Sequence, residues 1–251
     1  MIQEKIELFD VKFNNATMPE FLELLTELIA ANTKNNLIQT VNVDHIMLMR
    51  EDPEFDHIVR NAALITCDGM PIVWASKFKS VKLPERVTGA DMTLEIFKHS
   101  AAKDFKVFIL GAGPGVAELA AEKARETFEG VQITGVYSPA KEELQDADAS
   151  QAICRRVNES GANILLIALG APKQEKWYWK NREFLEVNAI IGVGASIDFI
   201  AGTQERAPVW MQNAGMEWSY RLMKNPNRMF QRYIVRDSKF LPLFIKEIIK
   251  K

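Results

Sequence analysis

Short apolar runs alternate with longer amphipathic segments from residue 37 onward. Each run is brief, rich in aliphatic residues and followed by Gly, Asp, Asn or Pro, which is typical of strands buried on both faces. The pattern predicts strands at Leu37–Val43, Ala63–Thr66, Phe105–Leu110, Val131–Val136, Asn163–Leu169 and Val187–Val193. The intervening segments predict helices at Asp44–Glu51, Pro71–Phe78, Ala90–Ala102, Gly115–Phe128, Asp148–Glu159 and Gln174–Phe184.

This alternation predicts an α/β fold of the Rossmann-like kind, a mainly parallel sheet with helices on both faces. Ligands of such folds bind in the crevice beyond the carboxyl ends of the strands. The residues that follow the predicted strands are therefore the first candidates for a site. They are Thr40 and Asn42, Cys67-Asp68-Gly69, Gly111, Tyr137, Gly170-Ala171-Pro172, and Gly194 to Asp198.

The composition changes after about residue 205. Residues 221–251 hold nine Lys or Arg against two Asp or Glu, with large apolar side chains among them. The cations recur every three or four residues, as on one helix face, although Asn225-Pro226 should divide that helix into two. They are Arg221, Lys224, Arg228, Arg232, Arg236 and Lys239. We therefore divide the chain into an α/β core, residues 1–205, and a basic, aromatic helical appendage, residues 206–251. The appendage suits membrane binding, with Phe230, Tyr233 and Phe240 expected to enter the headgroup zone.

Bulk properties exclude several classes of protein. The net charge is −2 and the sequence pI about 6.0, which argues against a nucleic-acid partner. Cys67 and Cys154 match no zinc spacing and suit a reducing cytosol. The N-terminus carries early charges and no long apolar run, so no signal peptide is expected, and no apolar stretch is long enough to span a bilayer.

A glycine-rich turn, Gly111-Ala112-Gly113-Pro114-Gly115, stands between a predicted strand and a predicted helix. A dinucleotide-binding loop would need a third glycine where Val116 stands, and an acidic residue after the next strand, which ends in Tyr137-Ser138. A nicotinamide-dependent oxidoreductase is therefore the weaker interpretation. A tight turn beside a phosphate or nucleoside fits better.

Asp146-Ala147-Asp148 has the form of the Asp-x-Asp pair with which many sugar transferases hold a metal ion. It lies in the polar stretch KEELQDADASQ, so we interpret it as a solvated helix start. The three histidines, His45, His57 and His99, are isolated, and surface or capping roles suffice for them. No metal site is predicted.

Two charged residues have competing interpretations. Asp68 follows a buried strand, where desolvation would raise its pKa toward that of a useful general base, but it could equally cap the next helix. Arg86 lies in a loop, and by itself favours a surface ion pair over a ligand contact. Lys173 and Gln174, after the Gly170 turn, are placed to face the crevice, and Asp198 follows a run of small residues.

Several of these segments occur together in a known bacterial family. They are Thr40-Val41-Asn42, Cys67-Asp68-Gly69, Glu85 through Asp91, Leu169 through Glu175, Gly192 through Asp198, Arg206-Ala207-Pro208, Gly215 through Trp218 with Tyr220-Arg221-Leu222, and Pro226-Asn227-Arg228 with Arg232-Tyr233. From about residue 37 to 236 the chain resembles the WecG/TagA/CpsF glycosyltransferases, glycosyltransferase family 26. The resemblance implies transfer of N-acetylmannosamine, its uronic acid or glucose from a UDP-sugar to a lipid-diphosphate-linked sugar. Such products feed wall teichoic acid, common antigen, capsule or exopolysaccharide synthesis.

The same resemblance implies roles for individual residues. Asp68 would be the base, Thr40, Asn42, Arg86 and Gln174 would line the acceptor side, and Gly111, Gly170 and Asp198 would hold the uridine diphosphate. Arg221, Arg228 and Arg232 would act from an appendage that closes over the active site at the membrane. The reaction would be inverting and independent of metal, with no cofactor.

The resemblance leaves the donor open. Val43 stands where many members have proline, and Ala195-Ser196-Ile197 replaces a commoner Gly-Thr-Phe-like run. N-acetylmannosamine is the expected donor sugar, and a polyprenyl-diphosphate-linked N-acetylglucosamine the expected acceptor. The expected location is cytoplasmic, on the anionic inner face of the cell membrane, with self-association when the protein leaves it. A non-enzymatic peripheral membrane protein is the alternative that rests on the appendage alone.

Overall fold

The computed structural model describes residues 5–250, apart from the side chain of Arg228. Its centre is a six-stranded sheet in which every neighbouring pair of strands is parallel, in the order β4-β3-β8-β7-β5-β6. The strands are β3 (Asn36–Val41), β4 (Leu64–Cys67), β5 (Lys106–Gly111), β6 (Gln132–Tyr137), β7 (Ile164–Ala168) and β8 (Ala189–Gly192). All six predicted strands are confirmed, with ends that differ by a few residues.

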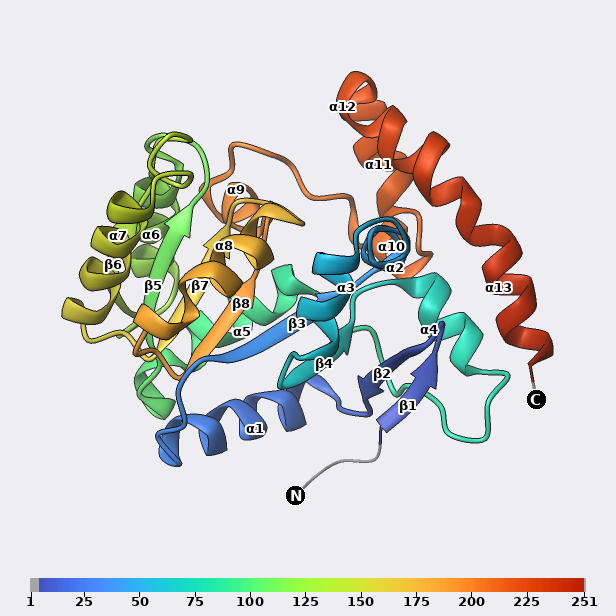
Figure 1. Ribbon diagram of the computed structural model, residues 1–251, viewed down its shortest axis with the longest axis horizontal. Coiled ribbons are helices and arrows are strands. Elements are labelled where there is room, and N and C mark those ends of the chain that lie inside the picture. The colour runs from blue at the N-terminus through green and yellow to red at the C-terminus, as the bar shows by residue number, and fades with distance from the viewer. Residues whose placement is uncertain (1–4, 251) are drawn as a thin grey trace.

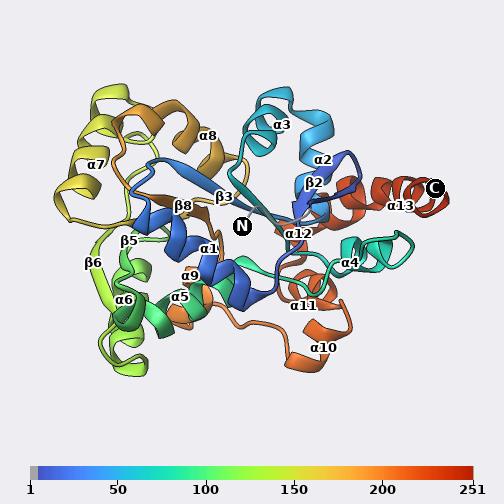
Figure 2. The ribbon, with the colours of Figure 1, turned by 90° about the horizontal axis from the view of Figure 1, so that it is seen from below.

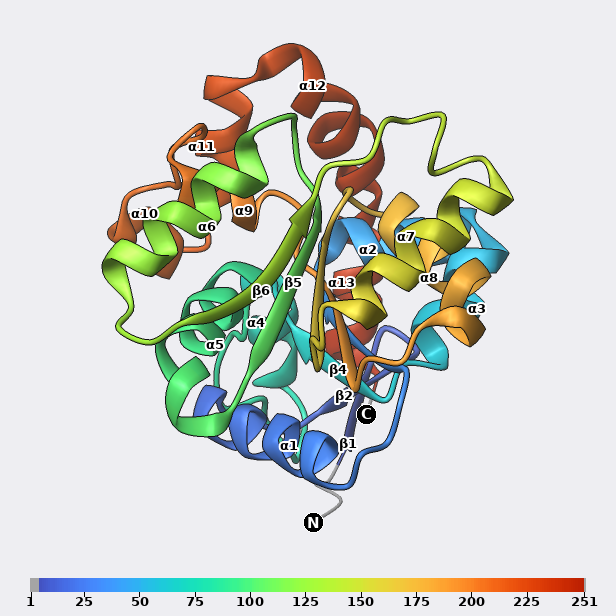
Figure 3. The same cartoon turned by 90° about the vertical axis from the view of Figure 1, so that its left-hand side faces the viewer.

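Helices cover both faces of the sheet (Figure 3). One face carries α1 (Met18–Ala30), α5 (Gly89–Lys103), α6 (Val116–Thr127) and α9 (Ser196–Ala201). The other carries α2 (Val43–Glu51), α3 (Pro53–Arg60), α4 (Met70–Ser76), α7 (Ala147–Glu159) and α8 (Lys173–Asn181), which continues as a 3-10 turn, Arg182–Phe184. Alternate residues of a strand enter opposite cores, so Val107 and Ile109 pack on one side, and Phe108 and Leu110 on the other. The predicted α/β architecture is confirmed.

A small hairpin, β1 (Lys5–Leu8) with β2 (Val11–Asn14), was not expected from the sequence. Its two turn residues, Phe9 and Asp10, have φ angles of 55° and 64°, as a tight two-residue hairpin requires. The Asn14 Oδ1 atom accepts a hydrogen bond from the backbone N–H of Ile65 at 2.9 Å, which ties the hairpin to β4. The hairpin therefore extends the edge of the core beneath the C-terminal helices.

The C-terminal segment is mainly helical. It contains α10 (Val209–Asn213), α11 (Glu217–Lys224), α12 (Pro226–Phe230), a π-helical turn (Gln231–Arg236), a 3-10 turn (Asp237–Lys239) and α13 (Phe240–Ile249). The predicted break at Asn225-Pro226 is confirmed. Figures 1 and 3 show α11 and α12 above the strand ends, and Figure 2 shows α13 beside α4 at one side of the molecule.

Membrane contact through Phe240 is a prediction that the structure contradicts. The Phe240 side chain is buried, and its ring centroid lies 4.8 Å from that of Phe9 in the hairpin turn. Phe230, in contrast, is exposed, whereas Tyr233 packs edge-on against Trp218 at 6.1 Å. Within residues 5–250, no helix has the length and apolar character needed to cross a bilayer.

Candidate active site

A cavity of about 540 Å³ lies between the carboxyl ends of β3 and β4 and the C-terminal helices. Five residues singled out in the sequence line it together: Asn42, Asp68, Arg86, Arg221 and Arg232. The first three belong to the core and the last two to the C-terminal helices. The cavity therefore exists only because segments more than a hundred residues apart in sequence meet here.

Asp68 stands at the floor of this cavity, directly after β4. Its backbone N–H donates to the carbonyl of Val41 at 2.9 Å, which aligns it with the end of β3. The N-cap of α4 is Gly69, and no side chain caps that helix, so the alternative interpretation of Asp68 as a helix cap is wrong. Burial, reinforced by the negative charge of Glu217, raises the pKa of Asp68 to about 7, against the opposing effect of Arg86 and Arg221. A carboxyl with that pKa is matched to general-base work near neutral pH.

Arg86 reaches the cavity because its loop runs along the end of β4. The backbone N–H of Val87 donates to the carbonyl of Cys67 at 2.8 Å. The Arg86 guanidinium contacts the Glu217 carboxylate at 3.5 Å, and both side chains are largely buried, with 13% and 15% exposed. The alternative interpretation of Arg86 as a surface ion pair is therefore wrong.

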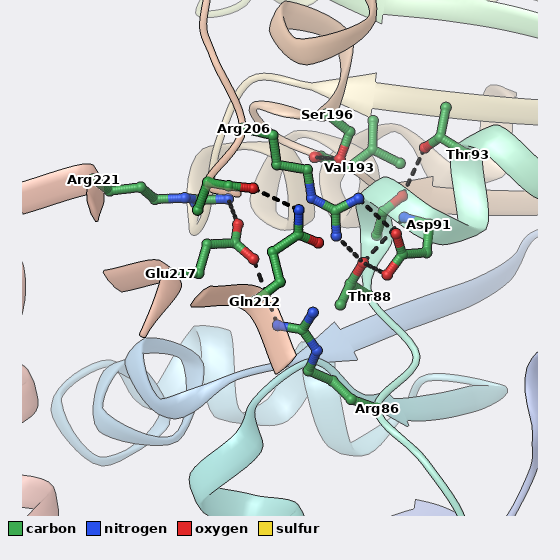
Figure 4. A network of polar contacts seen from close by, with 12 residues as sticks. Arg86, Thr88, Asp91, Thr93, Val193, Ser196, Arg206, Gln212, Glu217 and Arg221 are labelled. Atoms are coloured by element: carbon green, nitrogen blue, oxygen red, sulfur yellow. Dashed lines mark hydrogen bonds and ion pairs between the residues drawn. The ribbon is translucent and has the colours of Figure 1, made fainter. Parts of the chain in front are cut away.

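Glu217 is the hub of a network that joins the core to the C-terminal helices (Figure 4). One of its oxygens contacts Arg86, and the other accepts from Arg221 Nη2 at 2.6 Å. Beside it, Arg206 pairs with Asp91 at 2.6 Å. Alternating charges of this kind hold the guanidinium groups of Arg86 and Arg221 at the cavity wall.

A second set of ion pairs anchors the far side of the cavity. Asp44, 5% exposed, contacts both Arg232, at 3.1 Å, and Arg236 from the π-helical turn. The two arginines are four residues apart, which places them on the same side of the helix. Burial, together with the charge of Asp44, raises the pKa of nearby Asp237 to about 7. Buried ion pairs of this kind fix geometry more than they add stability.

Asn42 directly follows β3 and caps α2. Its Oδ1 atom accepts from the backbone N–H of His45 at 3.1 Å, while His45 Nδ1 accepts from the Asn42 N–H at 3.2 Å. Burial lowers the pKa of His45 to about 4, so the ring is neutral at physiological pH. The expected capping role of His45 is confirmed, and the cap fixes Asn42 beside Asp68.

Thr40 and Gln174 do not line this cavity. Both are buried, and Gln174 Oε1 accepts from the backbone N–H of Gly170 at 3.1 Å while its Nε2 donates to Glu175 at 2.8 Å. Gly192 leaves room for this amide, since a Cβ there would lie 2.3 Å from Gln174 Nε2. Gln174 therefore braces the ends of β7 and β8, and its contact with an acceptor stays a prediction, as does that of Thr40.

The residues predicted to hold uridine diphosphate lie along the same edge of the sheet. Gly111 ends β5 at φ +102°, and a Cβ there would lie 2.9 Å from the Ala168 carbonyl of β7, so only glycine fits. Gly170 has φ +76°, and Asp198 lies in the first turn of α9. Their nucleotide contacts stay predictions.

The C-terminal cations divide into two groups. Arg221 and Arg232 line the cavity and Arg236 faces Asp44, whereas Lys224 pairs with exposed Glu205 and Lys239 with Glu51 at the surface. The side chain of Arg228 lies outside the described part of the structure. Its predicted role is therefore untested.

Metal binding has no obvious ligand set in the described structure. Asp146 caps α7, with its Oδ1 accepting from the Ala149 N–H at 2.8 Å, which confirms the helix-start interpretation of the Asp-x-Asp run. Across residues 5–250, no three His, Cys, Asp or Glu side chains gather as metal ligands would. Independence from metal stays a prediction.

Three acidic residues of the cavity, Asp44, Glu217 and Asp237, were not assigned a role from the sequence. Glu217 lies within Gly215 through Trp218, one of the segments that carry the family resemblance. That resemblance could have indicated a role for Glu217. Asp44 lies two residues after Asn42, but nothing local indicates that it is buried against arginines nearly two hundred residues away.

Comparison with known proteins agrees with this geometry. The family model described as "Glycosyl transferase WecG/TagA/CpsF family" matches residues 6–251. The chain is 26% identical over 247 residues to proteins of Staphylococcus aureus strains MW2 and COL, covering 98% of this chain and 92% of each relative. Those relatives are named N-acetylglucosaminyldiphosphoundecaprenol N-acetyl-beta-D-mannosaminyltransferase.

The family match spans nearly the whole chain, including the C-terminal helices that complete the cavity. This protein is a glycosyltransferase, and it belongs to the WecG/TagA/CpsF family.

Proposed function

We propose that this enzyme transfers N-acetylmannosamine from its UDP derivative to a polyprenyl-diphosphate-linked N-acetylglucosamine. The product would serve cell-surface polysaccharide synthesis. The observation that carries the proposal is the cavity, in which a carboxyl of raised pKa faces three arginines under a helical cover. The name of the staphylococcal relatives supports the same donor sugar and acceptor.

The proposed chemistry is a single displacement. An acceptor hydroxyl attacks the anomeric carbon of the donor, Asp68 takes the hydroxyl proton, and the bond from that carbon to the UDP oxygen breaks. One carbon–oxygen bond forms as another breaks, so the anomeric configuration inverts. General-base catalysis contributes roughly 10²–10⁴-fold to such a step.

The departing diphosphate gains negative charge, and the arginines supply the compensating charge. Guanidinium groups keep their charge at every physiological pH and match phosphate oxygens in pairs. Arg221 and Arg232 already line the cavity, held there by Glu217 and Asp44. On this proposal the reaction needs no metal ion.

The nucleotide would lie along the sheet edge toward β7 and β5. β4 and β7 are three strand spacings apart, or about 14 Å, a distance that an extended nucleotide sugar can bridge. The Gly111 and Gly170 turns, Asp198 and the start of α6 at Gly115 border that stretch. Backbone N–H groups at a helix start favour phosphate.

Peripheral binding to the cytoplasmic membrane face would bring the enzyme to its lipid-linked acceptor. The C-terminal helices expose large apolar side chains, among them Met223, Phe230 and Ile249. Lysines of the same segment, such as Lys246, would add about 1 kcal/mol each at an anionic leaflet.

A donor panel tests the proposed function. The purified enzyme is incubated with UDP-N-acetylmannosamine, UDP-glucose or UDP-N-acetylmannosaminuronic acid, together with a short-chain prenyl-diphosphate N-acetylglucosamine. We expect UDP release and a lipid product heavier by one N-acetylmannosamine, unchanged by EDTA. Product from another sugar would correct the donor, loss of product with EDTA would contradict metal independence, and no product with any donor would overturn the proposal.

The pH dependence of the reaction reports on Asp68. A base acts in its unprotonated form, so kcat/KM should rise with pH through about 7 and then level off. Glu217→Gln removes a charge that raises the pKa of Asp68 and frees Arg86 and Arg221, which lower it. We therefore expect the midpoint of the Glu217→Gln profile at lower pH than that of wild type.

The matched control is Glu205→Gln, which removes an exposed carboxylate of the same region that pairs with Lys224 instead. Its pH profile should coincide with that of wild type. An unshifted midpoint in Glu217→Gln would show that the limb near pH 7 does not belong to Asp68.

A further inference from the structure

The cavity changes character from one end to the other. Its inner end, at β4, carries Asp68 and the arginines described above. Its outer end runs between α4 and α13, which lie side by side in Figures 1 and 2. There the lining is almost wholly apolar: Met70, Pro71 and Trp74 from α4, and Phe240, Leu241 and Phe244 from α13.

This apolar end is a groove whose two walls are held together by specific contacts. At its far end, Lys79 Nζ contacts Glu247 Oε1 at 2.8 Å and donates to the carbonyls of Glu247 and Lys250, which ties the end of α13 to the segment after α4. Glu247 is 6% exposed, so this tie is itself buried. Lys79 therefore joins the two walls at the outer end. At the inner end, Glu217 of α11 joins the C-terminal helices to the Arg86 loop.

Trp74 is held in position at the middle of the groove. Its indole packs over Gly215, where an added Cβ would lie 3.1 Å from the ring and 2.9 Å from Met70 Cβ. Gly215 also has φ +69°, a conformation that favours glycine. Trp74 nevertheless remains 38% exposed and Leu241 63% exposed, so large apolar surface faces the open groove.

A nucleotide sugar and an acceptor sugar offer only acetyl methyl groups and ring faces, which are too small to cover a groove lined by six apolar side chains. A ligand with a charged diphosphate joined to a hydrocarbon chain matches both ends, because cations line the inner end and apolar side chains the outer. We propose that the groove between α4 and α13 binds the first isoprene units of the acceptor's lipid. The groove thus selects acceptors by their lipid as well as by their sugar, an inference that rests on the proposed function.

The test compares acceptors that share N-acetylglucosamine diphosphate and differ in the group attached to it: a farnesyl chain or a methyl group. For Trp74→Ala, we expect KM for the farnesyl acceptor to rise roughly 10- to 100-fold, the loss expected when a large apolar contact is removed. The kcat, the KM of the UDP-sugar and the KM of the methyl acceptor should stay at wild-type values. Farnesyl acceptor is used without vesicles, so that membrane binding does not contribute.

Trp210→Ala is the matched control, because Trp210 is 64% exposed on α10 and does not line the cavity. It should leave both acceptors unaffected. The proposal is overturned if Trp74→Ala raises KM equally for both acceptors, changes neither, or shows its defect only on vesicles.

Direct binding separates this inference from the proposed function. Farnesyl diphosphate should quench the tryptophan fluorescence of the wild-type enzyme, and inorganic diphosphate should bind more weakly than farnesyl diphosphate. In Trp74→Ala, the two ligands should bind with similar affinity. If transfer fails with every donor while this difference persists, the reaction is wrong and the groove assignment stands. If transfer proceeds and the two ligands bind equally, the groove assignment is wrong.

Discussion

Asp68→Asn should lower kcat by roughly 10²–10⁴-fold, the contribution of a positioned general base. Asparagine keeps the shape of the side chain but cannot accept the acceptor's proton. Asp68 opens onto the cavity without capping α4, so the substitution should leave the helix and the fold in place. The measurement is kcat at saturating donor and acceptor, with UDP affinity and thermal unfolding recorded on the same samples; both should match wild type.

Asp237→Asn is the control for this substitution. Asp237 also lines the cavity, and its pKa is likewise raised to about 7, but it stands among Asp44, Arg232 and Arg236, away from the end of β4. We expect Asp237→Asn to keep most of the wild-type kcat. The assignment of Asp68 as the base would be wrong if kcat fell as far in Asp237→Asn as in Asp68→Asn, or if Asp68→Asn kept the wild-type kcat.

Arg232→Met should lower kcat by about 10²–10³-fold, the usual cost of removing one group that stabilises charge on a leaving oxyanion. Arg232 lines the cavity, and its pKa is raised, chiefly by the Asp44 charge acting against burial, so it is charged throughout the working pH range. Methionine keeps much of the side-chain length without the charge. The measurement is kcat against UDP-sugar at saturating acceptor.

The chain offers a close control in Arg236→Met. Arg236 pairs with the same carboxylate, Asp44, from the same π-helical turn, but it does not line the cavity. Each variant leaves Asp44 with one arginine, so any defect from a loosened helical cover is common to both. Equal loss of kcat in the two variants would mean that Arg232 holds the cover and does not act on the diphosphate.

The fold was largely predictable because its strands are strongly apolar and bounded by turn residues. Ile164–Ala168, for example, is fully buried, and Gly170 follows it closely. The β1–β2 hairpin was missed for the opposite reason. Its strands have four residues each with interspersed charges, and its Phe9-Asp10 turn lacks the Asn-Gly or Asp-Gly signature.

The site was predictable where a residue's position in a parallel sheet decides its surroundings. Asp68 and Asn42 follow neighbouring strands, and their meeting at one edge follows from the architecture. Glu217 and Asp44 depend on tertiary pairing instead. Their partners lie in distant segments, and no local pattern specifies which arginine meets which carboxylate.

Phe240 shows the limit of helical periodicity. The apolar side chains of the C-terminal segment alternate with cations in a way that suits a membrane surface, yet periodicity does not say which apolar residue turns inward. The hairpin turn at Phe9, itself missed, supplies the partner that buries Phe240. One undetected element therefore changed the interpretation of another.

On the proposed mechanism, the acceptor hydroxyl, deprotonated by Asp68, displaces UDP in one step. The anomeric configuration of the transferred sugar tests it most directly, measured by NMR on the lipid product through the one-bond carbon–hydrogen coupling. From an α-linked UDP-sugar, a single displacement gives a β-linked product. A β-linkage is the result we expect, and an α-linkage would contradict the mechanism.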